Sequence, residues 1–156
     1  MNNEILKQLL AQEDEIQLRY FNNQTAWDLG NAIKLAAEKM SVSVAIEVYA
    51  FEHVLFTYFM PGTSKDNHDW VRRKRQSVMR FGHSSFYQGQ YNASKGRDFE
   101  AQPHIDPKEY CAHGGSFPIR IKNSGIIGAV TVSGLPQETD HQLAVDALRK
   151  ILADQH

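Results

Sequence analysis

Hydrophobic and polar residues alternate along this chain with two different periods, and each period predicts one kind of element. Apolar residues three and four positions apart form one helical face, and this spacing predicts helices over 3–14, 25–40, 66–82 and 139–152. Alternation at every second position predicts half-buried strands over 15–20, 42–50, 53–60, 117–121 and 126–133. The remaining segment, 83–106, has little periodicity and is expected to be a long connection that holds no more than a helical turn.

Residues that start and stop these elements indicate how they pair. Phe51-Glu52 and Asn123-Ser124-Gly125 are short turns, and strands joined by short turns pair antiparallel. Thr25 is the expected N-cap of the second helix, and Thr139 with Gln142 offers a capping box for the last one. Because apolar helix faces need a sheet to cover, the pattern predicts an α+β fold, with a five-stranded antiparallel sheet and helices packed on it. No repeat or linker divides the chain, so we expect a single domain over 1–156.

Composition excludes several classes of protein. Hydrophobic residues make up 42% of the chain and charged residues 22%, as in ordinary globular domains, and no apolar run is long enough to cross a membrane. The 17 basic and 18 acidic residues nearly cancel, which argues against partners such as nucleic acid or an anionic membrane. Cys111 is the single cysteine, and the N-terminal stretch up to Glu13-Asp14-Glu15 lacks the basic and apolar parts of a signal peptide. We therefore expect a cytoplasmic protein.

The C-terminal half carries a recognisable combination of motifs. It reads His-Gly-Gly-Ser-Phe-Pro-Ile-Arg over 113–120, then Ser-Gly-Ile-Ile-Gly-Ala-Val-Thr-Val-Ser-Gly over 124–134, and continues to Asp140 at a helix start. This combination resembles the haem-degrading, HbpS/GlcG-like family, over roughly residues 15–153. Upstream, Pro61-Gly62-Thr63, the tryptophan-containing basic segment and a pair of serines are similar to a short-chain, cytoplasmic branch of that family, whose members are largely uncharacterised.

The resemblance implies a profilin-like fold and a homo-oligomer, either a dimer or a larger assembly. It also implies haem as a candidate cofactor, because some members of the family bind haem and assist its breakdown. The chain departs from those members in its tryptophan-containing basic helix and in the pair Ser84-Ser85, and no shared haem ligand can be matched residue by residue. The resemblance therefore supports the fold more strongly than it supports a reaction.

The basic segment of the third predicted helix is the first candidate site. Arg72, Arg73, Lys74, Arg75 and Arg80 follow closely on Trp70, and helical spacing places Asn67, Trp70, Lys74 and Ser77 near one line. Guanidinium and ammonium groups bind carboxylates or phosphates, and an indole stacks on a flat ligand. The alternative is a helix whose cations are solvated or paired with acidic groups of a neighbouring subunit.

The segment around the paired glycines is the second candidate. Gly114 and Gly115 let the backbone approach a ligand closely, and His113 beside them can donate a hydrogen bond, ligate iron or simply pair with a backbone carbonyl. Cys111 has no cysteine-enzyme motif around it, and the run of His104, Asp106, Glu109, Cys111 and His113 lacks the paired spacing of a zinc site, so no metal site is predicted. His141 is expected at the surface or at a subunit contact.

Together these observations predict a small-molecule-binding protein that takes a flat anionic ligand, with haem or another tetrapyrrole as the candidate. The predicted ligand-binding residues are Trp70, Arg73, Lys74, Ser84, Ser85, His113, Gly114 and Gly115. Two other functions stay open. In one, the basic helix and the leucine-rich terminal helix form subunit or partner interfaces without any chemistry. In the other, the chain is an enzyme on a small anionic metabolite, and no catalytic residue is assigned for it.

Overall fold

The computed structural model describes residues 3–156, and Met1 and Asn2, at the start of the stretch in which no signal peptide is expected, lie outside the described residues. Four strands form one sheet: β1 (Ala45–Ala50), β2 (His53–Phe59), β3 (Ser116–Ile121) and β4 (Gly125–Ser133). Their order is β2-β1-β4-β3, and every neighbouring pair is antiparallel. The α+β class and the antiparallel sheet are confirmed, whereas the prediction of five strands is wrong.

The strand predicted over 15–20 is absent because this segment meets the sheet at a single residue. Leu18 forms an isolated parallel bridge with Ile121, at the β3 edge. Its N–H donates to the carbonyl of Arg120 at 2.8 Å, and its carbonyl accepts from the N–H of Lys122 at 2.9 Å. Leu18 is fully buried but Tyr20 is 50% exposed, so the alternating pattern ends one residue beyond the bridge.

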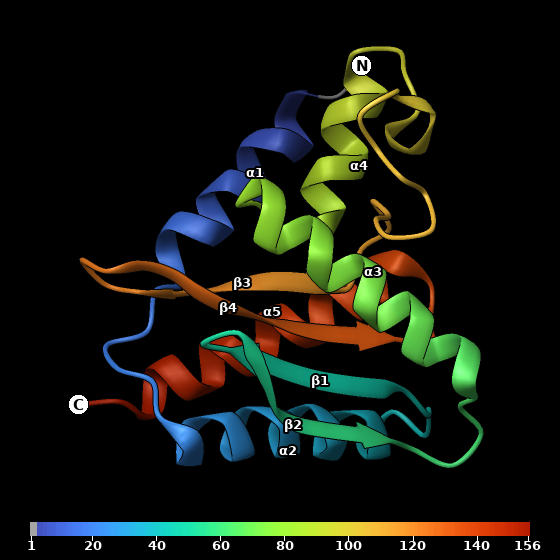
Figure 1. The fold of residues 1–156 in the computed structure, drawn as a ribbon. Coiled ribbons are helices and arrows are strands. Elements are labelled where there is room, and N and C mark those ends of the chain that lie inside the picture. Colours follow the sequence, from blue (N-terminus) through green and yellow to red (C-terminus); the bar gives the residue numbers. More distant parts are fainter. Residues whose placement is uncertain (1–2) are drawn as a thin grey trace.

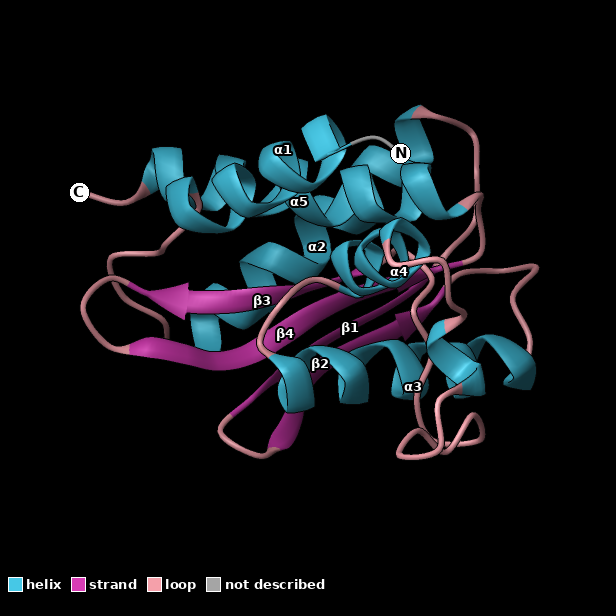
Figure 2. Ribbon diagram, turned by 90° about the horizontal axis from the view of Figure 1, so that it is seen from above, coloured by secondary structure: helices cyan, strands magenta, loops and turns pink. Residues whose placement is uncertain are grey.

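The helices lie on both sides of the sheet (Figures 1 and 2). They are α1 (Asn3–Glu15), α2 (Asn23–Lys39), α3 (Lys65–Phe81), α4 (Ser85–Ser94) and α5 (Gln137–Asp154), with a short 3-10 turn, η1 (Phe99–Ala101). Helices α2 and α5 cover one face of the sheet, and α3 crosses the other (Figure 2). Helices α1 and α4 pack against each other beyond the β3 edge (Figure 1).

The segment 83–106 holds a complete helix, α4, in addition to η1, and the prediction of a mainly irregular connection is therefore wrong. The buried side of α4 consists largely of polar residues, among them Gln88 and Asn92, so its sequence shows no apolar period. Gly89 in its middle, which reads as a helix breaker, is needed for packing. A Cβ atom there would lie 2.3 Å from the carbonyl oxygen of Ala112.

Two helix starts also differ from expectation. Asn22, not Thr25, is the N-cap of α2: its Oδ1 accepts from the N–H of Thr25 at 3.0 Å, while the Thr25 hydroxyl oxygen accepts from the N–H of Asn22 at 3.2 Å. Thr25 therefore completes a capping box from the third helical position. Helix α5 begins after Pro136, which has no capping side chain, so the predicted box of Thr139 and Gln142 is not formed.

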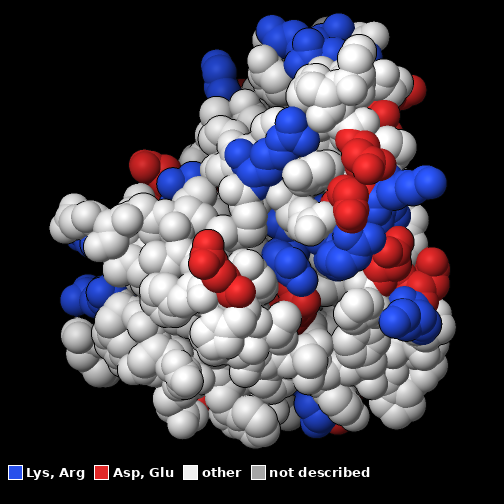
Figure 3. Space-filling view, viewed as in Figure 1, with Lys and Arg blue, Asp and Glu red and all other residues white. Residues whose placement is uncertain are grey.

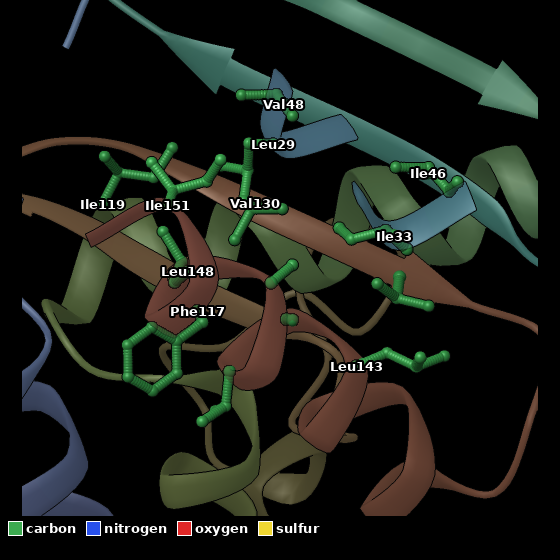
Figure 4. Packing of buried hydrophobic residues seen from close by; sticks show 14 of the residues in the cluster. Leu29, Ile33, Ile46, Val48, Phe117, Ile119, Val130, Leu143, Leu148 and Ile151 are labelled. Atoms are coloured by element: carbon green, nitrogen blue, oxygen red, sulfur yellow. The ribbon is translucent and has the colours of Figure 1, made fainter. Parts of the chain in front are cut away.

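The sheet face under α2 and α5 is apolar and forms the main core (Figure 4). Helix residues and strand residues interdigitate there, including Leu29, Ile33, Ile46, Val48, Phe117, Ile119, Val130, Leu143, Leu148 and Ile151. These are the stripes that the 3.6-residue and two-residue periods predict, because both periods gather apolar side chains on the face away from water.

The opposite face of the sheet, under α3, is polar although it is buried. Glu47 of β1 accepts two hydrogen bonds from the Arg75 guanidinium, at 2.9 and 3.3 Å. The hydroxyls of Ser116 and Thr131 share a hydrogen bond of 2.8 Å between β3 and β4. Ser77 of α3 donates to the carbonyl of Cys111 at 2.7 Å. Helix α3 is thus held to the sheet by directional polar contacts as well as by packing.

Candidate functional site

A cavity of about 250 Å³ opens where the first half of α3 faces the loop between β4 and α5. Asn67, Trp70 and Lys74 line it from α3, and the spacing of three and four residues that predicts their common line is what places them together. His113 and Asp140 line the opposite side, with the turn over 133–135 between them. The cavity therefore combines one aromatic wall with a buried pair of opposite charges.

Lys74 is the most deeply placed cation of this site. Its Nζ donates to the carbonyl of Val132 at 3.0 Å and to Oδ2 of Asp140 at 3.2 Å. The side chains of Lys74 and Asp140 are only 5% and 2% exposed. An ammonium group has three N–H donors, so one donor of Lys74 has no partner within residues 3–156.

Asp140 is held by donors on three sides. Besides Lys74, the N–H groups of Gly134 and Leu135 donate to its carboxylate at 3.3 and 3.1 Å. Burial raises the pKa of Asp140 to about 6, against the opposing effects of the Lys74 charge and these hydrogen bonds. The carboxyl group is therefore ionised at neutral pH and takes up a proton under mildly acidic conditions.

Trp70 is fixed by two neighbours. The Arg73 guanidinium lies 4.4 Å from the centre of the indole and covers one face of it. The imidazole of His113 meets the indole edge-on, with ring centres 5.2 Å apart and planes at 87°. His113 is exposed, so it forms part of the rim of the cavity rather than its floor.

The paired glycines let the chain pass close to Lys74. Gly115 has a φ of +141°, and a Cβ atom there would lie 2.7 Å from Nζ of Lys74 and 2.3 Å from the carbonyl oxygen of Val132. Gly114 donates its N–H to Oε1 of Gln137 at 2.9 Å. The structure thus brings the twin-glycine bend and the tryptophan-bearing helix together, which is the juxtaposition expected from the sequence.

Five predicted site residues do not line this cavity: the paired glycines Gly114 and Gly115, and Ser84, Ser85 and Arg73. Ser84 and Ser85 are fully buried. The Ser84 hydroxyl accepts from the N–H of Tyr87 at 3.1 Å and caps α4, and the Ser85 hydroxyl oxygen accepts from the N–H of Ser116 at 3.0 Å. Arg73 turns away from the cavity, since its Nε donates to the carbonyl of Pro107 at 3.2 Å. A ligand role for these five residues stays a prediction.

Three other cations of α3, Arg72, Arg75 and Arg80, are paired within the chain, and acidic residues lie beside the basic ones on this face of the molecule (Figure 3). Arg72 donates to Asp69 at 2.8 Å and also to Glu109. These bonds lower the pKa of Asp69 and raise the pKa of Arg72. Arg80 donates to the carbonyl of His104 at 3.2 Å. The neighbouring-subunit partners considered for these cations are therefore not required.

The sequence prediction missed Asp140, which lines the cavity on the side opposite α3. It placed Asp140 at a helix start and gave it no role in the site, although this residue is the counter-ion of Lys74. Its position in the first turn of α5, six residues after the Val-Ser-Gly end of a strand, was the available signal, since loops that follow strands often carry functional residues. His141, expected at the surface, is buried: its Nε2 pairs with Gln12 at 2.8 Å, and its Nδ1 has no partner within the described chain.

Residues 3–156 contain neither a cluster of metal ligands nor a membrane-spanning helix. The acidic, histidine and cysteine residues of this range do not gather in any group of three or more that could hold a metal ion, and the run from His104 to His113 does not form one. None of the helices described here combines the length and apolar character needed to cross a bilayer.

Comparison with known proteins gives relatives along almost the whole chain. A UPF0303 protein of Psychromonas ingrahamii is 60% identical over 153 residues, which cover 97% of this chain and 96% of the relative. The UPF0303 protein SCO2848 of Streptomyces coelicolor is 41% identical over 147 residues, covering 94% of this chain and 93% of the relative.

Solved structures give the same result. The Ybr137w protein superposes with a TM-score of 0.89 at 35% identity, covering 97% of this chain and 90% of that one. HbpS superposes with a TM-score of 0.69 at 20% identity, covering 90% and 94%, a likeness that concerns the fold alone. The family described as haem degrading protein HbpS-like matches residues 21–149. This chain therefore belongs to the HbpS-like haem-degrading protein family.

Proposed function

We propose that this protein is a cytoplasmic, single-domain, small-molecule-binding protein whose cavity between α3 and the β4–α5 loop takes a small anionic metabolite. The observation that carries the proposal is the unused N–H donor of buried Lys74 at a cavity walled by Trp70. A hydrogen bond from a buried ammonium to a carboxylate is worth about 1.5–3 kcal/mol, more than a bond between neutral groups. The indole supplies a flat apolar surface for the rest of the ligand.

The charge of the site is set by Asp140. At neutral pH its carboxylate offsets the Lys74 charge, and below a pKa of about 6 it takes up a proton. Protonation leaves the Lys74 cation without its counter-charge, so an anion gains attraction in the cavity. We therefore expect an anionic ligand to bind more tightly at pH 5.5 than at pH 7.5.

Haem is the ligand that the family description names, and one structural relative is described as a PduOC:Heme complex, at 17% identity. The residues of this cavity do not fit the whole group. A volume of about 250 Å³ falls below the ~300–1,000 Å³ of typical ligand pockets. Arg73 is turned away, so Lys74 alone would face the two propionates. A small acid fits the cavity better than a tetrapyrrole does.

The chain is also proposed to act as a homo-oligomer. Trp27 on α2 and Val54 and Tyr58 on the edge strand β2 are 58%, 42% and 38% exposed. Trp27 and Tyr58 lie around an open cavity of about 600 Å³. Large apolar side chains beside an unpaired strand edge favour association with another copy. By contrast, the leucine stripe of α5 packs into its own core and is not available for an interface.

The test of ligand binding is a thermal-shift titration with acetate, benzoate and nicotinate at pH 5.5 and 7.5. A ligand that binds the folded state raises its melting temperature. We expect at least one of these acids to stabilise the protein, more strongly at pH 5.5, and the Trp70→Ala variant to lose this response. Trp27→Ala is the matched control, because it removes the other tryptophan, which lies away from this cavity.

Absence of any carboxylate response, or equal responses in the two tryptophan variants, would contradict the proposed site. A titration with haemin tests the family's ligand separately, because a shifted Soret band that disappears in Trp70→Ala would show that this cavity accepts haem after all. Light scattering tests the assembly. We expect more than one copy per particle for the wild type and a smaller particle for Tyr58→Asp.

A further inference from the structure

A second cavity, of about 350 Å³, lies between α4 and the segment that follows it, away from the α3 site. His83, in the short link between α3 and α4, is one of its lining residues. Its Nδ1 lies 2.9 Å from Oε1 of Glu13, which belongs to α1 and is only 3% exposed. This buried carboxylate also accepts from the N–H of Ser84 at 3.1 Å and from Arg120 at 3.3 Å.

These contacts fix the tautomer of His83. An ionised carboxylate only accepts hydrogen bonds, so Nδ1 of the imidazole must carry the proton that it donates to Glu13. In the neutral ring Nε2 is then an acceptor on the opposite side. No partner for Nε2 is present in the described part of the chain, and the side chain is 36% exposed at the cavity. The neutral form of His83 thus presents an oriented acceptor.

Much of the lining of this cavity is aromatic. Tyr87 and Tyr91, one helical turn apart on α4, stack with ring centres 5.8 Å apart and planes at 19°. The His83 ring lies 4.7 Å from that of Tyr87, with the two planes inclined at 43°. Phe99, which is buried, closes the cavity from the other side. Such a surface matches the face of a planar ring system.

The charge at this cavity is positive. Arg97 lines it and is oriented by Asn92, whose Oδ1 accepts from the Arg97 Nε at 2.7 Å. Asn92 is itself only 3% exposed, so it is a rigid anchor. The terminal nitrogens of Arg97 remain available, and no aspartate or glutamate lines the cavity among the residues described. An anionic substituent on the ligand would therefore meet a cation in the lining, while the nearby Glu13 carboxylate pairs with His83 and does not line the cavity.

We propose that this cavity is a second binding site, for a planar heteroaromatic anion that stacks on Tyr87 and Tyr91. Its ring N–H or O–H donates to Nε2 of His83, and its acidic group pairs with Arg97. The site uses neither Trp70 nor Lys74, so it is independent of the function proposed above.

The test is a fluorescence titration with two planar anionic probes, flavin mononucleotide and pterin-6-carboxylate. We expect at least one probe to bind the wild type and to bind at least tenfold more weakly to His83→Asn. This substitution keeps an N–H donor for Glu13 but removes the ring acceptor. His53→Ala is the matched control, since His53 is an exposed histidine whose Nδ1 pairs with the carbonyl of Phe51.

A second variant, Glu13→Gln, changes the hydrogen-bond partner of His83 and leaves the imidazole itself in place. An amide at this position can donate to Nδ1, which would move the ring proton to Nε2 and turn the acceptor into a donor. Should that variant fold poorly, Tyr91→Leu tests the stacking surface instead, and it too should weaken binding tenfold. Unchanged affinity in His83→Asn and Tyr91→Leu, no binding of either probe to the wild type, or loss of binding in Trp70→Ala would each overturn the proposal.

Discussion

Lys74 and Asp140 form an ion pair that is almost completely removed from solvent, with Nζ 3.2 Å from Oδ2. Each charge depends on the other, because an isolated charge in the interior loses its hydration without compensation. The same pair lines the candidate site. The stability of the fold and the electrostatics of the site are therefore set by the same two side chains.

Removal of one partner should be costly. We expect Lys74→Met to lower the free energy of unfolding by about 3–5 kcal/mol, because it leaves the Asp140 carboxylate buried without a cation. Urea unfolding measures this loss, and adding Asp140→Asn should recover at least half of it. Lys34→Met is the control: it breaks a surface pair with Glu38, whose side chain is 49% exposed, and should cost no more than about 0.5 kcal/mol. Equal losses in the two single variants would contradict this assignment.

Asp140 and His141 should respond to acid in opposite directions. Burial raises the pKa of Asp140 from 3.8 to about 6 and lowers that of His141 from 6.5 to about 4. Between pH 4 and pH 6 the folded state therefore binds more protons than the unfolded state at Asp140, and fewer at His141. Acidification through this range adds stability through Asp140 and removes stability through His141, so the two effects oppose each other.

Substitution should separate these two effects. In the Asp140→Asn variant only the effect of His141 remains. The stability of this variant should therefore fall more steeply than that of the wild type between pH 6 and pH 4. His141→Gln should show a shallower fall or a rise. Urea unfolding at several pH values gives the slopes, and comparison with the wild type cancels the contributions of the other groups. Identical slopes for the two variants would show that neither group titrates as its burial implies.

Gly115 should tolerate no side chain. Gly115→Ala places a Cβ atom against Nζ of Lys74 and the Val132 carbonyl, in a backbone conformation that L residues rarely adopt. Gly96→Ala is the control, since Gly96 also has a positive φ, +72°, but has nothing within 4 Å of its Cβ position. We expect about 1–2 kcal/mol of destabilisation at Gly96 and a clearly larger value at Gly115, measured by thermal unfolding. A loss at Gly115 no larger than at Gly96 would argue against the close approach.

Cys111 should be unreactive in the folded protein. The thiol is fully buried, and burial raises its pKa. Because the thiolate is the reactive form, we expect modification by an aromatic disulfide reagent to follow the rate of unfolding and to become immediate in denaturant. Complete modification of the native protein within the mixing time would indicate an accessible thiolate instead.

The apolar part of the fold could be predicted from the sequence, whereas the polar part could not. The stripes of α2 and α5 and the hairpins follow from periodicity, because burial of apolar surface dictates both. Helix α4 escaped detection because Gln88 and Asn92 on its buried side carry no apolar signal. The fifth strand was predicted wrongly because Leu18 is buried by a single bridge rather than by a strand.

The candidate site could also be predicted only in part. Trp70, Lys74 and His113 could be grouped because local spacing and the paired glycines marked them. Asp140 lies 66 positions beyond Lys74, and Glu13 lies 70 positions before His83, so each pairing depends on tertiary packing. Periodicity in the sequence gives no sign of pairs this far apart, because the arrangement of the helices on the sheet decides which distant residues meet.

The polar face of the sheet beneath α3 has one more consequence. An apolar interface allows a helix to slide slightly with little penalty, whereas matched donors and acceptors admit a single docking position. Since α3 carries Trp70 and Lys74, any shift of the helix would also break the Arg75–Glu47 bonds. The side chains of the candidate site are thus held in place by the fold itself, and a ligand of the proposed kind would bind with little rearrangement of the protein.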